Sequence, residues 1–116
     1  MNNLLIRPQK TPLRGVIRVP GDKSISHRAV MLGALADGVS IVRDWLPAGD
    51  TIATLEGFQA LGVPIAIDKH SSTAWDLTIE GQGLHGLRPS PDPIDCRNAG
   101  TFMRLAAGIM AGQRFP

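Results

Sequence analysis

The sequence predicts an α/β fold in which short strands alternate with amphipathic helices. Segments with the alternation or β-branched character of strands take turns with segments whose apolar residues recur at helical spacing. Thirteen glycines and nine prolines are spread between these segments, as expected of turns rather than of a linker. With 43% hydrophobic residues, the 116-residue chain can form a folded core.

The first predicted pair of elements is a strand followed by a helix. Residues 13–19 are β-branched and alternate toward their end, so we expect a strand that stops at the Pro20-Gly21 turn. A helix is expected from about Ser26 to Ala36, with apolar residues on one face and Asp37-Gly38 as its stop. Ser24 and Ser26 are both suitable N-cap residues for it.

A second pair repeats this order. Residues 39–45 alternate and are predicted to form a strand. The loop that follows leads into a helix over residues 50–62, with Asp50 as its expected N-cap and an apolar stripe that belongs to the core.

Two short strands and a third helix complete the predicted order. Residues 63–67 and 76–80 are expected to pair antiparallel, joined by a polar loop that is longer than a tight hairpin turn. Residues 81–93 are rich in turn formers and irregular, and a helix is predicted over about residues 100–111. The order up to residue 80 is therefore β-α-β-α-β-β.

The stretch from Val19 to Leu35 places basic residues around the start of the first helix. Free N–H groups and the positive end of the helix dipole favour a bound phosphate or carboxylate there. Lys23 precedes the expected helix start, and Arg28 shares a helix face with Ser24, so its guanidinium could hold a phosphate through two hydrogen bonds. The alternative is that the serines are only caps and that Lys23 and Arg28 are solvated charges.

A second informative stretch runs from Asp95 to Arg104. Asn98, Gly100 and Thr101 put small residues at the head of an apolar helix, where backbone N–H groups can approach an anion closely. On its own this pattern has little specificity, and mere capping is the alternative.

Together the two stretches resemble a known family. Gly21-Asp22-Lys23-Ser24-Ile25-Ser26-His27-Arg28-Ala29 resembles the N-terminal signature of the 5-enolpyruvylshikimate-3-phosphate (EPSP) synthase family, and Asn98-Ala99-Gly100-Thr101 resembles its second helix start. The resemblance implies that Lys23, Ser24 and Arg28 bind shikimate 3-phosphate, and that Lys23 and Gly100 border phosphoenolpyruvate. Asn98, Thr101 and Asp50 are further candidates, and helix capping is the competing role for Asp50.

The resemblance also implies an architecture. Family members are built from six βαβαββ units, three in each of two lobes, which form an inside-out α/β barrel. Residues 1–20 would then be a strand segment and hinge that belong with the other lobe, and residues 21–116 an incomplete N-terminal lobe. We therefore expect that the chain needs the remaining lobe and is inactive alone.

The implied reaction transfers the carboxyvinyl group of phosphoenolpyruvate to the 5-hydroxyl of shikimate 3-phosphate, without a metal or an organic cofactor. Glyphosate would compete for the phosphoenolpyruvate site. Two departures stand out, because many members have Gly where Arg97 stands and Pro where Leu105 stands. The alternatives are a sister enolpyruvyl transferase with another acceptor, or a non-catalytic fragment that binds anions.

Several other classes of protein are disfavoured. A net charge of +2 and isolated Trp45 and Trp75 argue against a nucleic-acid partner. No apolar run is long enough for a membrane span, and the histidines lack metal-site spacing. Cys96 is the single cysteine and is expected to be a small buried residue, which fits a cytoplasmic location.

Overall fold

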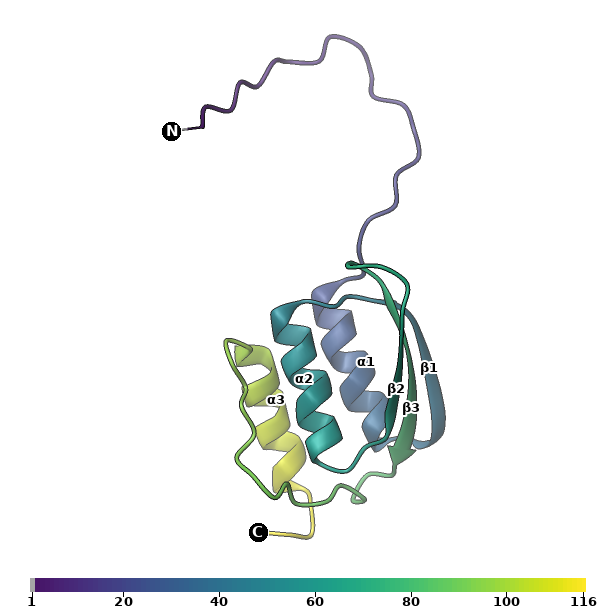
Figure 1. Ribbon diagram of the computed structural model, residues 1–116, viewed down its shortest axis with the longest axis vertical. Coiled ribbons are helices and arrows are strands. Elements are labelled where there is room, and N and C mark those ends of the chain that lie inside the picture. Colours follow the sequence, from purple (N-terminus) through teal and green to yellow (C-terminus); the bar gives the residue numbers. More distant parts are fainter. Residues whose placement is uncertain (1) are drawn as a thin grey trace.

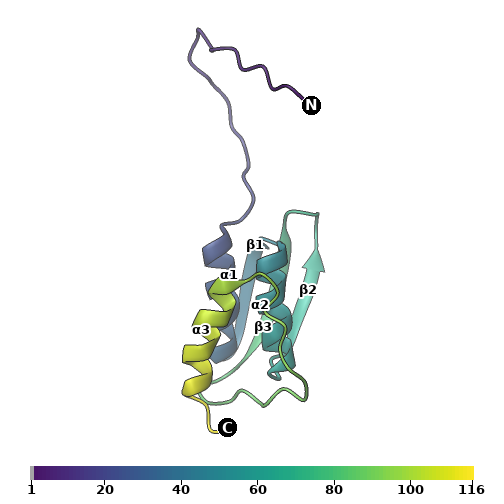
Figure 2. The ribbon, with the colours of Figure 1, turned by 90° about the vertical axis from the view of Figure 1, so that its left-hand side faces the viewer.

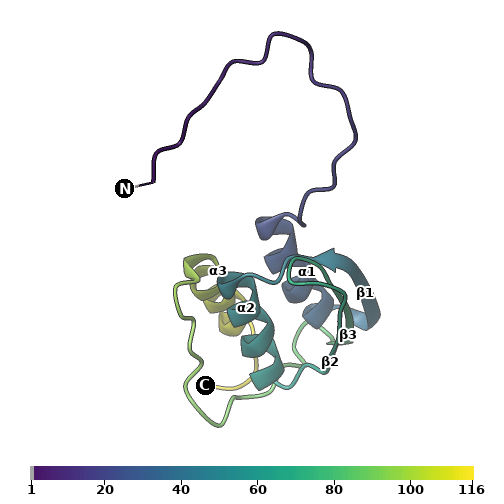
Figure 3. The same ribbon diagram turned by 45° about the horizontal axis from the view of Figure 1, so that its top comes forward.

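The computed structural model describes residues 2–116 and contains a three-stranded sheet with helices on one of its faces (Figure 1). The elements are α1 (Lys23–Leu35), β1 (Asp37–Trp45), α2 (Gly49–Ala60), β2 (Ile65–Lys69), β3 (Trp75–Gln82) and α3 (Gly100–Ala111). Helix α1 packs on the sheet, α2 lies beside α1, and α3 lies on the other side of α2 (Figures 1 and 3). The α/β fold class predicted from the sequence is thus confirmed.

The sheet is antiparallel throughout, with β3 in the middle of the order β1-β3-β2. Leu77 and Ile79 of β3 are fully buried beneath the helices, whereas Thr78 between them points to the outer face. Val39 and Ile41 of β1 are 65% and 66% exposed. The sheet therefore has one core face and one open face.

All three helices run in the same direction, so their N-termini lie at one end of the molecule (Figures 1 and 2). Strand β1 returns the chain to this end between α1 and α2. The segment from residue 83 to residue 99, which has no helix or strand, returns it again before α3. The two signature stretches consequently lie at the same end.

The predicted strand over residues 13–19 is not formed. Residues 2–22 contain no helix or strand and extend away from the folded part (Figure 1). A strand needs a neighbour to pair its backbone groups, and this segment pairs with neither β1 nor β2, the two edge strands of the sheet. Its apolar side chains stay exposed, with Val16 at 99% and Leu13 at 86%.

The predicted start and cap of α1 were also wrong. The helix begins at Lys23 rather than near Ser26, and Asp22 is its N-cap, because its Oδ1 accepts the Ile25 N–H at 2.7 Å. Neither Ser24 nor Ser26 has this role. Lys23 and Ser24 are therefore part of the first turn instead of preceding it.

Asp50 is likewise not the N-cap of α2. The helix begins at Gly49, and Ala48 occupies the cap position. The Thr51 hydroxyl accepts the Ala48 N–H at 2.9 Å and lies 2.6 Å from the Leu46 carbonyl oxygen, to which it can donate. Asp50 is in the first turn, where the helix dipole favours a carboxylate.

The rest of the predicted order holds. The strands corresponding to residues 63–67 and 76–80 are β2 and β3, which pair antiparallel, and α3 has the predicted bounds. Trp45 and Trp75 are not isolated, since their rings stack at 5.8 Å with an interplanar angle of 28°. Trp45 is 1% exposed, so the stack belongs to the core rather than to a surface platform.

Candidate active site

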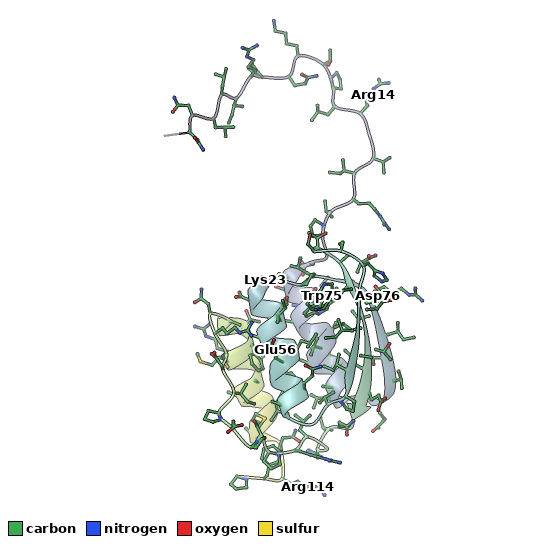
Figure 4. All side chains as sticks on the ribbon, in the orientation of Figure 1. Arg14, Lys23, Glu56, Trp75, Asp76 and Arg114 are labelled. Carbon is green, nitrogen blue, oxygen red and sulfur yellow. The ribbon has the colours of Figure 1, made fainter. Side chains whose placement is uncertain are left out.

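The first signature stretch lies on the first two turns of α1. Lys23 and Ser24 are the first two helical residues, Arg28 follows one turn later, and all three are exposed. The Lys23 ammonium forms an ion pair with the Asp50 carboxylate in the first turn of α2. The site is thus an open helix end rather than a buried pocket (Figure 4).

The loop between β1 and α2 fixes the start of α1. The Trp45 indole N–H donates to the Ser26 carbonyl oxygen at 2.8 Å, and the Leu46 N–H donates to Ser26 Oγ at 3.0 Å. A Cβ on Gly21 would overlap the Asp44 carbonyl oxygen, so only glycine fits there. Ser26 and Gly21 in the signature therefore position the helix instead of facing a ligand.

The end of β1, just before this loop, is in turn held by the β2–β3 hairpin. Asp44 has a left-handed backbone with φ of 53°, and its N–H donates to Asp76 Oδ1 at 3.0 Å. His70 Nε2 lies 3.1 Å from Asp76 Oδ2. The hydrogen bond from the Asp44 N–H, followed by that from His70, lowers the pKa of Asp76. The bond to Asp76 raises the pKa of His70.

A cleft of about 390 Å³ adjoins this cluster. It lies between the hairpin residues Ser71, Thr73 and Ala74 and the segment that leads into α1, including Arg18 and Gly21. It is open on one side, and its polar side chains are those of Arg18, Asp44, Ser71 and Thr73. We assign no ligand to it.

His27 lies between α1 and α2, one turn below Lys23. It is 1% exposed, and its Nδ1 is 2.6 Å from Thr54 Oγ1, while Nε2 is buried without a hydrogen-bond partner among residues 2–116. Burial, and then the charge of Lys23, lower its pKa. Both effects favour the neutral form of the His27 ring. The described residues contain no group of three or more His, Cys, Asp or Glu side chains that could hold a metal ion.

The second signature stretch forms the start of α3. Gly100 is the first helical residue and is half-buried, while Asn98 and Thr101 are exposed. A Cβ on Gly100 would lie 2.7 Å from Arg104 Nη1, so the Arg104 guanidinium lies close to the helix start. Arg104, which ends the second signature stretch, was not among the predicted site residues, although its spacing of four residues from Gly100 could have indicated that it lies close to the helix start.

The start of α3 is held against the second half of α2 by two contacts. The Phe102 ring sits on Gly57, where a Cβ would come within 2.7 Å of Phe102 Cε1. The Arg97 guanidinium forms an ion pair with Glu56 of α2, which is labelled in Figure 4. Arg97 has a φ of 47°, in the left-handed region that favours glycine, which is the residue that the family resemblance led us to expect there. Cys96, expected to be buried, is half-buried.

The structure thus brings the predicted candidates to one end, but in separate groups. Lys23, Ser24 and Arg28 are on α1, Asp50 on α2, and Asn98, Gly100 and Thr101 at the start of α3. Three parallel helix starts present unpaired N–H groups and the positive ends of their dipoles to this end. Such an arrangement can bind anions, and phosphates in particular.

Comparisons with known proteins agree with this reading. The model of the EPSP synthase (3-phosphoshikimate 1-carboxyvinyltransferase) family matches residues 8–116. The chain belongs to the EPSP synthase family. A relative from Citrifermentans bemidjiense, named 3-phosphoshikimate 1-carboxyvinyltransferase, is 50% identical over 115 residues, covering 99% of this chain and 25% of that protein.

Two further members of the EPSP synthase family also match most of this chain with less than a quarter of their own length. One from Geobacter sulfurreducens, with the same name, is 54% identical over 103 residues, or 89% of this chain and 23% of that protein. The solved structure of EPSP synthase from Acinetobacter baumannii superposes with a TM-score of 0.77 at 40% identity, covering 87% of this chain and 22% of that one. The chain therefore spans about a quarter of the length of the curated relatives it matches. Within residues 2–116, no helix has the length and apolarity needed to cross a bilayer.

Proposed function

We propose that this chain contributes part of an active site that transfers the carboxyvinyl group of phosphoenolpyruvate to the 5-hydroxyl of shikimate 3-phosphate. The observation that carries the proposal is the gathering of the two signature stretches at one end of three parallel helices (Figures 1 and 2). Both substrates are polyanions, so their site must supply cations and oriented N–H groups. This end of the molecule offers both.

The residues take separate roles in this proposal. Ser24 and Arg28 bind shikimate 3-phosphate, Lys23 lies between the two substrates, and Gly100 borders phosphoenolpyruvate. Asn98 and Thr101 shape the turn beside it. The hydroxyl adds to the protonated double bond, and the tetrahedral intermediate then eliminates phosphate, so no cofactor is required.

Further parts of the site come from outside these 116 residues. The groups that move protons, and further arginines, belong to the rest of a full-length family member, and we expect no turnover from this chain alone. Residues 1–20 belong with the other lobe, and the exposure of apolar side chains such as Val16 and Ile17 supports this assignment. Glyphosate competes with phosphoenolpyruvate, the enzyme acts in the cytoplasm, and neither nucleic acid nor membrane is a partner.

Arg28→Lys tests the proposal because it keeps the charge and removes the planar fork. Loss of one charge-assisted hydrogen bond, worth about 1.5 kcal/mol, should weaken binding of shikimate 3-phosphate roughly tenfold. The affinity is measured by titrating the ¹⁵N-labelled chain and following the backbone amides of α1.

The matched control is Arg114→Lys, which makes the same change at the opposite end of the molecule (Figure 4). Its affinity should equal that of the parent chain. If Arg28→Lys binds shikimate 3-phosphate as tightly as Arg114→Lys, Arg28 is only a solvated charge and the proposed role fails.

A further inference from the structure

The Lys23 ammonium already has an anionic partner within the chain. Asp50 on α2 pairs with it, and the exposed fractions of the two side chains are 54% for Lys23 and 27% for Asp50. Asp50 is also in the first turn of α2, where the helix dipole stabilises its negative charge. The Asp50 carboxylate is thus held beside the Lys23 ammonium, which in the proposed function binds the substrates.

A second contact fixes the spacing of the two helices at this point. His27 follows Lys23 by four residues on α1, and Thr54 follows Asp50 by four residues on α2. The His27 and Thr54 side chains meet at 2.6 Å. Both are buried, with exposed fractions of 1% and 0%. The backbones carrying Lys23 and Asp50 therefore cannot easily separate, and the ion pair opens only by rotation of the Lys23 or the Asp50 side chain.

We propose that Asp50 is an internal counter-ion that competes with anionic ligands for Lys23 and so sets their affinity. The inference rests on the proposed function, in which Lys23 binds an anion. A phosphate dianion on Lys23 would stand about 6 Å or less from the Asp50 carboxylate. At that separation the repulsion at a solvent-exposed site amounts to roughly a three- to tenfold loss of affinity.

The competition also affects which anions bind. The repulsion from Asp50 grows with the charge of the ligand, so it penalises a dianion more than a monoanion of similar size. Because an ammonium has three donors, Lys23 can keep one hydrogen bond to Asp50 while a ligand with lower charge takes another. Asp50 therefore favours less highly charged ligand groups at Lys23.

The test is a titration of the 116-residue chain with inorganic phosphate at a pH of about 7.5, where the dianion predominates. We expect Asp50→Asn to lower the Kd, measured from the amide shifts of Ser24 and Ile25, by about three- to tenfold. Glu80→Gln is the matched control, because it removes the same charge from an exposed position at the far end of β3. This control should leave the Kd close to that of the parent chain.

Lys23→Met separates the two proposals. If it weakens phosphate binding while Asp50→Asn fails to tighten it, the proposed function survives and the counter-ion role is overturned. If Lys23→Met has no effect, Lys23 is not an anion ligand and both fail.

A melting curve of each variant shows whether it is folded, and Asp50→Ser replaces Asp50→Asn if the latter is not. A Kd for the folded Asp50 variant that is equal to or above the parent value, or the absence of any phosphate-dependent shift, overturns the proposal.

Discussion

Replacement of Gly57 by alanine should destabilise the chain by forcing apart α2 and α3. The added Cβ would lie 2.7 Å from Phe102 Cε1 and still closer to the ring tip. Phe102 is 1% exposed and packs against Phe58 at a centroid distance of 6.1 Å, so its ring has little room to move. Overpacking of this kind costs about 1–3 kcal/mol, against a gain of about 1 kcal/mol from the higher helix propensity of alanine. We expect a net loss of up to about 2 kcal/mol.

Gly108→Ala is the matched control for this substitution. Gly108 is in α3 and exposed, and a Cβ there would meet no atom within 4 Å. The same change should therefore stabilise the chain by about 0.5–1 kcal/mol through helix propensity alone. The free energies of unfolding are measured by urea unfolding of the parent chain and both variants. All three curves are fitted with the same slope of free energy against urea concentration.

The opposite signs of the two effects make the comparison decisive. If Gly57→Ala gained as much stability as Gly108→Ala, the close packing of the Phe102 ring against Gly57 of α2 would be refuted. The start of α3, with Gly100, would then not be held by that contact, and its placement beside the second half of α2 would need another cause.

Three further predictions concern the helix ends. Trp45→Phe removes the donor to the buried Ser26 carbonyl and should lower the free energy of unfolding in urea by about 1–3 kcal/mol. A variant with unchanged stability would show that this hydrogen bond does not hold α1. Because the folded-state pKa of His27 is lowered, the unfolded chain binds more protons below a pH of about 6.5, so stability should fall as the pH decreases from there. His27→Asn should flatten this part of the profile, and an unchanged slope would contradict it. Gly100→Ala need displace only the flexible end of Arg104, so its melting temperature should change little while phosphoenolpyruvate, and glyphosate more strongly, lose affinity. A lower melting temperature with an unchanged ratio of the two affinities would remove Gly100 from the site.

His70 offers an internal check on the pH argument. Its pKa is raised in the folded chain by Asp76, so its contribution to stability is full below a pH of about 6.5 and is lost as the pH rises. This is the reverse of the His27 effect. His70→Asn should therefore remove the gain in stability that accompanies a fall in pH toward about 6.5, and it should leave the slope below that pH unchanged.

Elements with strong local signals were predictable from the sequence. Helix α3 has the bounds that its glycine start and apolar period indicated, and β2 and β3 pair antiparallel as the polar loop between them implied. The placement of both signature stretches at helix starts also followed from local patterns. In each case the information lies within about a dozen consecutive residues.

The wrong predictions depend on contacts between distant residues. Asp22, Ser24 and Ser26 are all competent N-cap residues, and the choice among them is settled by the loop that ties Ser26 to Trp45 and Leu46. The stack of the two tryptophans needs the register of β1 against β3, which places Trp45 opposite Trp75. The strand over residues 13–19 failed because strand formation requires a partner, which propensity alone cannot supply.

The convergence of the candidate residues is a property of the topology rather than of any motif. An α-helix of twelve residues is about 18 Å long, so the starts of successive helices meet only if the chain returns the whole way between them. Strand β1 makes this return once. After α2 the chain goes up along β2, down along β3 and up again through residues 83–99, an odd number of passes that brings α3 back to the same end. Removing one pass would place Gly100 at the opposite end from Lys23 with both motifs intact, so the pairing of β2 with β3 is as necessary to the proposed site as the residues themselves.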